Sequence, residues 1–506
     1  MVKPSYDRRS EEEDAPTPDA TEAVRRPLPL VVDLDRTLLA TNLTLECLFV
    51  LAKRHVWRLL LVPLWLIRGR AAMKRALALE APPDIETLPT HSEALARLRQ
   101  AKQEGIPLVL VSASDRFLAD AIARRLGLFT AVLASDGDFE CSGARRRSQL
   151  VAEFGAARFA DASFAGKRET AHPAGRQETV AGFGAAMQLT PERSAIDRVL
   201  AAAAAGLAPY VTALRPYQWA KNALIFVPLF AAHMLTDRER LGQAALAFVA
   251  FSLCASAGYV LNDLLDLPSD RRHPRKKHRP LASGQVSPVR MLLVVPALLV
   301  VAAALALLLP PAFGGVLALY FTATLGYSLR LKDVAILDVL TVAGLYAMRV
   351  WAGSIAIGVV ASPWLLIFSI FVFLSLAMVK RYAELMAMRA LDGDKAHARA
   401  YLLEDSELLA SLGGSSGYIA VLVLALYISS DHAQHFYARG ALLWGECVLL
   451  LYWISHVWLM AHRARMHDDP LVFAVRDRVS RLLIALMGII FFLALLPEGA
   501  LSLIGR

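Results

Sequence analysis

The sequence predicts a multi-domain protein: an α/β, doubly wound N-terminal domain followed by an all-α bundle of nine transmembrane helices. Apolar residues make up 56% of the 506-residue chain and charged residues only 20%, which is too apolar for an ordinary soluble enzyme. The composition also changes near residue 195, from mixed segments to repeated apolar runs of about the length that crosses a bilayer.

These changes divide the chain into four segments. Residues 1–28 are polar and rich in acid and proline, so we expect a disordered tail, and residues 29–163 alternate strand-like and helix-like patterns. Residues 164–195 are rich in Gly, Ala and Thr and are expected to be a linker, and residues 196–506 are the membrane domain. The four cysteines are scattered without a CxxC pair, which argues against a disulfide framework and against a zinc site.

Nine apolar runs are expected to span the membrane. They are about 219–235, 242–262, 290–309, 312–329, 335–358, 363–379, 416–430, 440–460 and 482–503. The loops after the second, fourth, sixth and eighth runs hold most of the Lys and Arg residues of the membrane domain, so the positive-inside rule places these loops and the N-terminus in the cytoplasm. We therefore predict a multi-pass protein of the inner (plasma) membrane. The net charge of +9 then reflects topology, and no nucleic-acid partner is expected.

A shorter apolar stretch, residues 58–67, lies inside the N-terminal domain. It is too short to span a bilayer and is flanked by Arg54, Arg68 and Arg70. Two interpretations remain open: an amphipathic segment on the membrane surface, or a buried helix of the soluble domain.

The strongest chemical signal lies at the end of the second apolar run. Asn262, Asp263, Asp266 and Asp270 occur within nine residues, and on a helix Asp266 and Asp270 share one face. Carboxylate oxygens that converge in this way suit Mg²⁺, which takes phosphate oxygens and water as its other ligands. Acids at the end of a membrane span are costly unless they are paired or bind a metal, so they indicate function.

A dense basic loop follows, with Lys276, Lys277 and Arg279 within residues 271–279. Next to an acid cluster, such a loop favours a metal-bound polyphosphate between the two. The alternative for the basic run alone is a solvated stretch that sets membrane topology.

The two runs together read NDxxDxxxD and HPxKxxRPxxSG, and over about residues 210–506 the chain resembles the UbiA prenyltransferase superfamily. The resemblance implies nine spans around a cavity that faces the cytoplasm. It also implies that Asn262, Asp263, Asp266 and Asp270 hold Mg²⁺ and a diphosphate, with Asp266 and Asp270 as catalytic residues.

The chain departs from the aromatic prenyltransferases of that family, which carry a second DxxxD motif between spans six and seven. Lys380 and Arg381 stand there instead. The stretches 215–222 and 327–332 resemble the decaprenyl-phosphate phosphoribosyltransferase branch, which implies phosphoribosyl pyrophosphate as donor and a polyprenyl phosphate as acceptor. The residues expected to bind substrate are Lys221, Asn222, Lys276, Lys277, Arg279, Tyr327, Lys332, Lys380 and Arg381.

Alternatives stay open at this stage. Lys332, Lys380 and Arg381 either hold phosphates or anchor the membrane edge. The enzyme either transfers phosphoribose or moves a prenyl group from its diphosphate to an aromatic or other acceptor, and a transporter or membrane scaffold is the alternative of another class. Residues 467–469 (His-Asp-Asp) are interpreted as a loop cap, with metal binding as the alternative.

The N-terminal domain opens with an apolar strand that ends in DxDxT, Asp33 to Thr37, and resembles haloacid-dehalogenase-like phosphatases. The resemblance implies that Asp33 is the nucleophile, Asp35 the general acid/base and Ser112 a phosphate-binding residue. It also implies that Asp33, Asp35 and Asp161 hold Mg²⁺. Arginines 145–147 stand where that family has a lysine, and Asp161 replaces an acidic pair. The domain is therefore expected to be either a phosphatase or a degenerate domain kept for docking or regulation.

Overall fold

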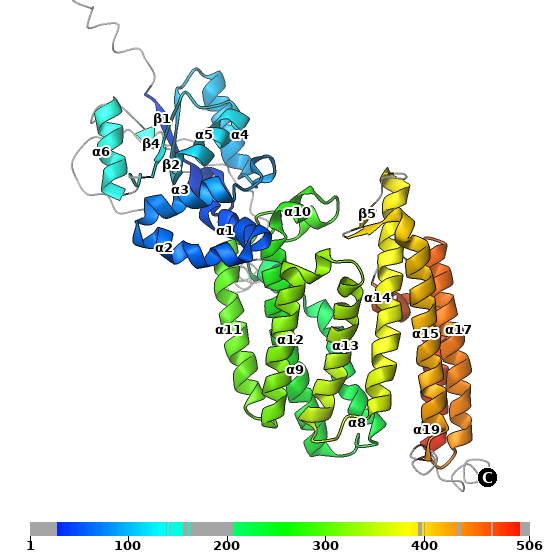
Figure 1. The fold of residues 1–506 in the computed structure, drawn as a ribbon. Coiled ribbons are helices and arrows are strands. Elements are labelled where there is room, and N and C mark those ends of the chain that lie inside the picture. Colours follow the sequence, from blue (N-terminus) through cyan, green and yellow to red (C-terminus); the bar gives the residue numbers. More distant parts are fainter. Residues whose placement is uncertain are drawn as a thin grey trace, which may run out of the picture. The chain divides into compact units, whose positions relative to one another are not determined.

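The computed structural model describes residues 28–137, 139–141, 143–154, 160–161, 206–392, 397–398, 400–431, 433, 437–466 and 469–495. Within these residues the chain divides into two units (Figure 1). One contains residues 28–47 and the described residues from 60 to 161, and the other contains residues 48–59 and those from 206 onward. The predicted tail and linker lie outside the described residues.

The first unit is built on a four-stranded parallel sheet. Its strands are β1 (Leu30–Asp33), β2 (Leu108–Asp115), β3 (Ala131–Ser135) and β4 (Ala160–Asp161), in the spatial order β3-β2-β1-β4. Leu30 pairs with Leu108 on one side and with Ala160 on the other. Strand β2 is almost continuously buried, as expected for a parallel strand covered on both faces. The predicted doubly wound α/β domain is confirmed.

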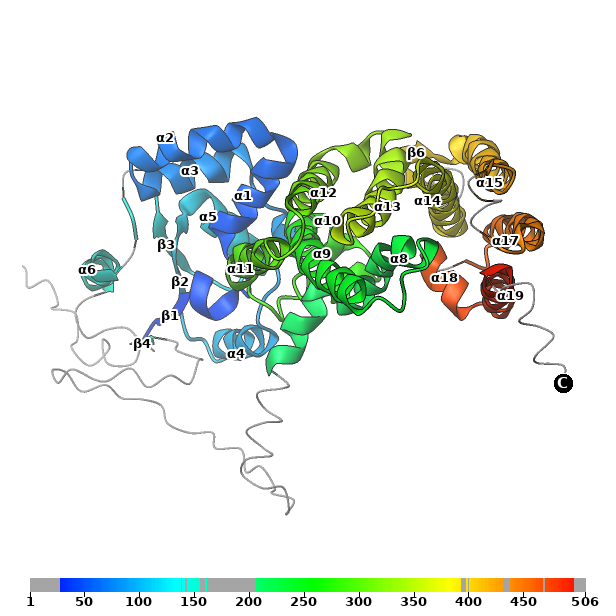
Figure 2. The same ribbon diagram turned by 90° about the horizontal axis from the view of Figure 1, so that it is seen from below.

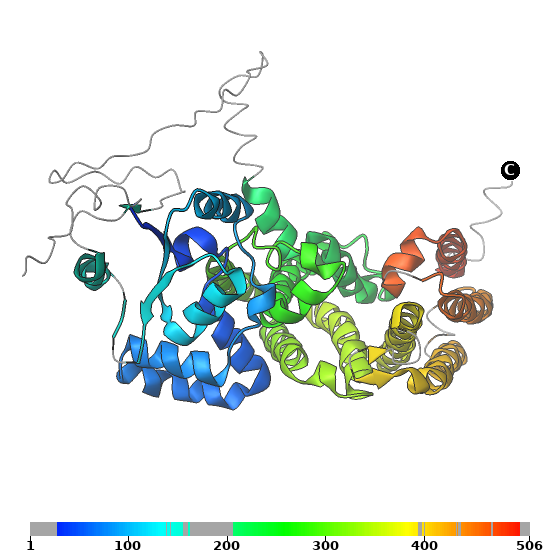
Figure 3. The same cartoon turned by 90° about the horizontal axis from the view of Figure 1, so that it is seen from above.

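The other elements up to residue 161 are helical. They are η1 (Leu34–Leu38), α1 (Leu43–Arg54), α2 (Val62–Ile67), α3 (Arg70–Glu80), α4 (Ser92–Gln103), α5 (Arg116–Leu126) and α6 (Gly143–Phe154), with short 3₁₀ turns η2 (Val56–Leu61) and η3 (Ile85–Thr87). Residues 48–59, the larger parts of α1 and η2, belong to the second unit. Figure 3 shows α2 and α3 side by side. Helix α5 follows β2 directly, because Asp115 accepts the N–H of Phe117 at its start and Gly127, at φ 60°, ends it.

The apolar stretch 58–67 lies in η2 and α2, and none of its residues is buried. The exposed fractions of Leu60 and Ile67 are 78% and 82%. The interpretation of this stretch as a buried helix is therefore wrong, and its placement on a membrane surface stays a prediction.

The second unit is a bundle of long apolar helices, seen end-on in Figure 2. Eight described helical segments are long and apolar enough to cross a membrane. They are α9 (Arg238–Leu265), α11 (Pro288–Ala306), α12 (Pro311–Leu329), α13 (Leu337–Ala356), α14 (Pro363–Asp392), α15 (Ser406–Ile428) with its preceding turn η8 (Leu403–Asp405), α17 (Trp444–His462) with η9 (Gly440–Leu443), and α19 (Arg478–Leu495).

The first predicted span has a different structure from the others. Its residues form a 3₁₀ segment, η4 (Pro216–Phe226), followed by the short helix α8 (Val227–Ala231). Pro216 and Pro228 each stand at the start of one of these segments, where the missing N–H and fixed φ of proline are tolerated. This segment brings Lys221 and Asn222 into the bundle.

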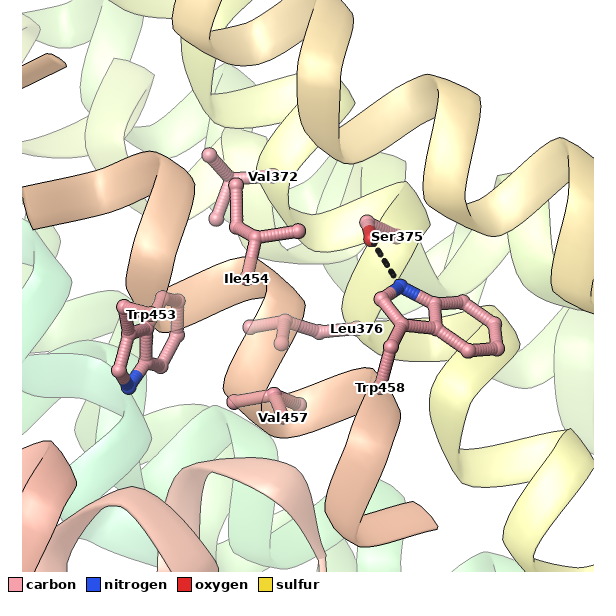
Figure 4. A pocket seen from close by; sticks show the side chains of 7 residues that line it. All are labelled: Val372, Ser375, Leu376, Trp453, Ile454, Val457 and Trp458. Atoms are coloured by element: carbon pink, nitrogen blue, oxygen red, sulfur yellow. Dashed lines mark hydrogen bonds between the residues drawn. The ribbon is translucent and has the colours of Figure 1, made fainter. Parts of the chain in front are cut away.

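Several apolar clusters hold the described part of the bundle together, and two of them are large. One surrounds Phe251, Phe313 and Tyr320, and the other surrounds Phe373 and Trp453. A small recess between α14 and α17 is lined by apolar and aromatic residues and Ser375 (Figure 4). There the indole N–H of Trp458 donates to Ser375 Oγ at 3.1 Å, so the recess is part of helix packing.

Short elements connect the helices at the acid-rich end of α9. Helix α10 (Leu267–Arg272) and the turn η5 (Lys276–His278) follow α9, and η6 (Leu331–Asp333) follows α12. The strands β5 (His397–Ala398) and β6 (Tyr401–Leu402) follow α14, and α18 (Pro470–Arg476) precedes α19.

Candidate active site

The acid motif lies where α9 passes into α10. Helix α9 ends at Leu265 with Asp266 as its C-cap, but the N–H of Asp270 donates to the carbonyl of Asp266 at 2.8 Å, so the helical path continues through Pro268. The acids of the motif are thus spread along a nearly continuous helix. Asp263 and Asp270 are buried, and the side chain of Asp266 is 16% exposed.

Arg279 joins two of these acids. Its Nη1 atom lies 3.1 Å from Asp263 Oδ1 and 2.5 Å from Asp270 Oδ2. Arg215, the residue before η4, also contacts Asp263. Its Nη2 atom lies 2.5 Å from Asp263 Oδ1 and 2.8 Å from Asp263 Oδ2. One positive group therefore bridges Asp263 and Asp270, seven residues apart in the sequence.

Lys332 joins the other two members of the motif. Its Nζ atom lies 2.7 and 2.8 Å from the oxygens of Asp266 and 3.3 Å from Asn262 Oδ1. The sequence placed Asp266 and Asp270 on one helix face. In the structure these two acids contact different cations, with Asn262 on the side of Asp266 and Asp263 on the side of Asp270.

The donor set fits a hard divalent cation. Within the described residues, no three His, Cys, Asp or Glu side chains already stand in a metal-binding arrangement. Each pair of oxygen donors is nevertheless close enough to share one positive group, which is the arrangement that a cation needs. Mg²⁺ held mainly by carboxylates and phosphate oxygens is consistent with these residues.

The pKa values of Asp270 and Asp266 are shifted in opposite directions. Burial raises the pKa of Asp270 above its usual value, although Arg279 opposes this effect. Burial also acts to raise the pKa of Asp266, but the Lys332 ammonium outweighs it and the pKa of Asp266 is lowered. Asp266 is therefore the more firmly ionised of the two.

A second polar cluster consists of Lys221, Lys380 and Asp469, which we call the two-lysine cluster. The Oδ2 atom of Asp469 lies 2.8 Å from Lys221 Nζ and 3.2 Å from Lys380 Nζ. The three residues come from η4, from α14 and from the residue before α18. Burial acts to raise the pKa of Asp469, but the two ammonium groups outweigh it and hold that pKa well below its usual range.

A buried arginine lies beside this cluster. Arg349 of α13 donates from Nε to Asn222 Oδ1 at 2.8 Å and from Nη2 to Tyr320 Oη at 2.8 Å. Its guanidinium carbon also stands 5.2 Å from the ring centre of Tyr346, and the Lys221 ammonium stands 5.8 Å from the same ring centre. Asn222 is buried here and accepts from Arg349, and its role in binding substrate stays a prediction.

Tyr259 connects the acid motif with the two-lysine cluster. It precedes Asp263 by one helical turn, and the Arg215 guanidinium stands 5.7 Å from its ring centre. Tyr259 also interacts electrostatically with both Arg349 and Lys221. The negative and positive parts of the site are therefore neighbours.

Arg381 and Tyr327, both predicted to bind substrate, form a buried ion-pair network. Arg381 contacts the carboxylates of Asp338 and Glu384, and Tyr327 donates to Asp338 Oδ1 at 2.7 Å. Asp338 is fully buried. This network holds the end of α12 and the start of α13 against α14, so both residues have a structural role whether or not they touch substrate.

The predicted lysines of the basic loop lie in η5. Lys277 is exposed, whereas Lys276 is half-buried. His273 shapes this loop, since its Nδ1 accepts the N–H groups of Arg275 and Lys276 at 3.2 and 3.3 Å. Sequence reasoning assigned no site role to Arg215, Tyr259, Arg349 or Asp469, although Arg215 and Asp469 lie within stretches that it singled out. His467 and Asp468 lie outside the described residues.

The N-terminal unit brings its predicted residues together at the carboxyl end of β1. Asp33 Oδ1 accepts the N–H groups of Asp35 and Arg36 at 3.0 Å, which leaves Oδ2 for another partner. Asp35 accepts the hydroxyl groups of Ser112 and Ser114, each at 2.8 Å. Ser112 therefore binds the second acid of DxDxT here.

Arg146 stands at the place of the expected lysine. Its Nη1 atom lies 2.5 Å from Asp33 Oδ2, so the positive charge that the sequence comparison found missing is supplied by an arginine of α6. Asp161 belongs to β4, whose partner β1 pairs Val31 with it. The structure thus places Asp161 on the strand next to Asp33.

Comparisons with known proteins agree with this architecture. Residues 223–474 match the UbiA prenyltransferase family, and residues 30–172 match the haloacid dehalogenase-like hydrolases. The protein y4nM of Sinorhizobium fredii is 33% identical over 474 residues, which cover 93% of this chain and 92% of that protein.

Two further similarities involve the membrane part. Decaprenyl-phosphate phosphoribosyltransferase of Mycobacterium tuberculosis is 38% identical over 183 residues, 35% of this chain and 61% of that enzyme. A solved UbiA homologue from Archaeoglobus fulgidus bound to DMAPP and Mg²⁺ aligns with a TM-score of 0.43 at 16% identity, covering 56% of this chain and 98% of that one. The chain belongs to the UbiA prenyltransferase family and carries a haloacid dehalogenase-like domain ahead of its membrane part.

Proposed function

We propose that this membrane transferase moves phosphoribose from phosphoribosyl pyrophosphate to the phosphate of a polyprenyl phosphate. The observation that carries the proposal is the pairing of two unlike sites: an acid motif suited to a metal-bound diphosphate, and next to it the cation-rich two-lysine cluster. An acceptor that is itself a phosphate needs such a cationic site, whereas a neutral aromatic acceptor does not. The similarity to decaprenyl-phosphate phosphoribosyltransferase supports the same choice.

In this proposal the acid motif binds the donor. Mg²⁺ held by Asn262, Asp263, Asp266 and Asp270 would withdraw negative charge from the pyrophosphate leaving group. Arg279 and Lys332, which neutralise these acids in the structure, are positioned to turn to phosphate oxygens once the donor is present. Lys276 and Lys277 in the adjoining turn would add positive charge at the entrance.

The acceptor does not require a general base. A phosphate monoester is already an anion at neutral pH, so its oxygen can attack the ribosyl carbon directly as the pyrophosphate leaves. The protein's task is then to hold two negatively charged groups close together. This need explains why cations outnumber anions beside the acid motif.

Membrane placement follows from the loop charges. The acid motif lies at the same end of the bundle as the basic loop 271–279, so we expect the site on the cytoplasmic face of the inner membrane. Phosphoribosyl pyrophosphate is water-soluble and charged, and such a site would meet it directly.

Transfer of label tests the proposal. Purified full-length protein is incubated with Mg²⁺, phosphoribosyl pyrophosphate labelled in the ribose, and decaprenyl phosphate, and label in the lipid phase is counted. We expect transfer by wild type and by Asp237→Asn, a conservative change at the N-cap of the opposite end of α9, but not by Asp266→Asn. Label that stays in water while a known phosphoribosyltransferase transfers it would refute the proposal.

The second candidate is prenyl transfer, which the UbiA family supports at its general level. Under this candidate, a labelled prenyl diphosphate would be consumed with Mg²⁺ in the presence of an aromatic acceptor. A transporter would instead produce ion flux in liposomes without chemical transfer.

We also propose phosphatase activity for the N-terminal domain, because Arg146 supplies the cation beside Asp33. Its proposed substrate is the 5-phosphate on the ribose of the lipid product. Inorganic phosphate release that depends on Asp33, with the phosphoribosyl lipid as substrate, would support this activity, and an untouched 5-phosphate would exclude that substrate.

A further inference from the structure

In the two-lysine cluster, the carboxylate of Asp469 lies between the two ammonium groups, where a bound anion would also lie. Asp469 Oδ2 contacts both ammonium groups, whereas its Oδ1 accepts the N–H of Leu471 at 3.2 Å and caps α18. The two oxygens therefore have separate tasks. One fixes the start of α18, and the other places a negative charge between Lys221 and Lys380.

The charges of this region do not balance. Lys221 and Lys380 share one aspartate, and in the described part of the chain Arg349 donates hydrogen bonds to neutral groups: Asn222, Tyr320 and the carbonyl of Leu345. The side chains of Lys221 and Asp469 are 15% and 14% exposed, whereas that of Lys380 is 36% exposed. Excess positive charge near the interior of a membrane bundle is costly, so this region favours an additional anion.

A phosphate group has the chemistry that this region lacks. It brings up to two negative charges and three oxygens, enough to contact both ammonium groups at once. Lysine suits this task as a flexible point charge, since its stem lets the ammonium group follow the ligand.

The groups present in each site indicate which substrate it binds, the diphosphate donor or the phosphate acceptor. The acid motif pairs with Arg215 through Asp263, whereas Lys221 and Lys380 of the two-lysine cluster pair with Asp469. A diphosphate donor needs a metal held by the acid motif, and no aspartate besides Asp469 contacts Lys221 and Lys380 among the described ion pairs. The two-lysine cluster is thus suited to a phosphate that binds without metal.

We propose that Lys221 and Lys380 bind the phosphate group of the lipid acceptor, and that Asp469 is a competing internal anion which the acceptor displaces. This inference rests on the proposed function for the identity of the lipid, and it assigns the acceptor subsite and a residue that sets its affinity. Displacement leaves Asp469 as the cap of α18, and the start of this helix can then shift away from the lysines.

Equilibrium binding tests the subsite without requiring catalysis. Decaprenyl phosphate and the alcohol decaprenol are titrated into full-length protein in nanodiscs, with EDTA present so that metal does not contribute. Wild type is expected to bind the phosphate more tightly than the alcohol. Lys221→Ala and Lys380→Ala are expected to lose at least about tenfold in phosphate affinity, and Lys380→Arg to keep most of it.

Asp469→Asn gives the distinguishing result. The asparagine keeps a side-chain acceptor for the cap of α18 but removes the competing charge. Phosphate affinity should then rise by about tenfold, because the lysines are no longer occupied by Asp469 before the ligand binds. If Asp469 were only structural, the same change would leave the affinity equal or weaker, and that result would overturn the proposal. Asp237→Asn serves as the matched control and should bind like wild type.

The outcomes separate this inference from the proposed function. If phosphate binding follows these expectations but no phosphoribose is transferred, the subsite stands and the proposed reaction is wrong. If transfer occurs while binding is insensitive to Lys221, Lys380 and Asp469, the reaction stands and the subsite is wrong. Lys380→Arg and Asp469→Asn preserve size and polarity, so the test remains decisive even if an alanine variant does not fold.

Discussion

A Cβ atom added to Gly353 would lie 2.1 Å from the carbonyl oxygen of Ile225. The backbone of α13 therefore touches the backbone of η4 at this point, and only glycine permits such an approach. The contact matters for chemistry because η4 carries Lys221 and Asn222. One helical turn before Gly353, Arg349 donates to Asn222 at 2.8 Å.

Gly353→Ala is expected to push η4 away from α13. The clashing atoms belong to backbone, which cannot turn aside as a side chain can, so we expect a loss of about 1–3 kcal/mol in stability, the usual cost of overpacking. Thermal unfolding in detergent and binding of decaprenyl phosphate should both weaken. Gly344→Ala is the matched control on the same helix, because a Cβ there meets nothing within 4 Å. Equal behaviour of the two variants would contradict the close packing.

Asp266→Asn is expected to lower transfer by about a hundredfold, the upper end for changes around a metal site, and to raise the Mg²⁺ concentration required. The change removes the ionised member of the pair that Lys332 now joins, while its shape is kept. A Mg²⁺ titration of the transfer rate checks this expectation. An unchanged Mg²⁺ requirement would show that the metal is held elsewhere.

The pH dependence of donor binding should report Asp270. Burial raises its pKa, so as pH falls Asp270 takes up its proton earlier than an ordinary aspartate, and the acid motif loses one negative charge. Donor binding in the presence of Mg²⁺ should therefore decline from a pH above the usual aspartate range. Arg279→Gln removes the cation that opposes this shift, and the decline should move to still higher pH. A decline that stays in place or moves downward would contradict this assignment.

The sequence was sufficient for features that depend on local pattern. Eight of the nine predicted spans appear as long apolar helices in the described residues, because hydrophobic length alone determines them. The first span was different, since prolines 216 and 228 start short segments there. Contacts between residues far apart in the chain could not be predicted from the sequence. Lys221 and Asp469 are 248 residues apart, and Arg146 and Asp33 are 113 apart. No periodicity links such positions, and only the tertiary fold brings them together.

Arg146→Ala is expected to reduce any phosphatase activity of the N-terminal domain by about a hundredfold or more, as loss of a charge-stabilising donor does. Arg146 contacts Asp33 at 2.5 Å, whereas its neighbour Arg145 is exposed. Hydrolysis of a generic phosphate monoester by the full-length protein measures the effect. Arg145→Ala is the control and should behave as wild type, and Arg146→Lys should retain part of the activity. Equal loss in both alanine variants would point to a general basic surface instead.

The packing of α15 gives a prediction about stability that is separate from chemistry. Gly413 and Gly417 form a GxxxG pair on the face of α15 that meets α14 and α17. A Cβ on Gly417 would lie 2.5 Å from Ile454 Cγ2 and 3.0 Å from Ser375 Oγ, and Figure 4 shows both of these side chains at the recess. Small residues here let the helices approach closely and gain van der Waals contacts. In a membrane such contacts stabilise helix association, because lipid tails are as apolar as the side chains and no hydrophobic driving force is present.

Gly417→Val should therefore lower the unfolding temperature in detergent, at a cost of about 1–3 kcal/mol. Transfer per folded molecule should change little, because the acid motif belongs to α9 and α10 and not to this helix interface. Gly414→Ala, three residues earlier on α15, is the matched control, since a Cβ at Gly414 meets nothing within 4 Å. If Gly417→Val unfolded at the wild-type temperature, the tight contact between α15 and α17 would be wrong. If it lost transfer without losing stability, this interface would have to act on the site at a distance.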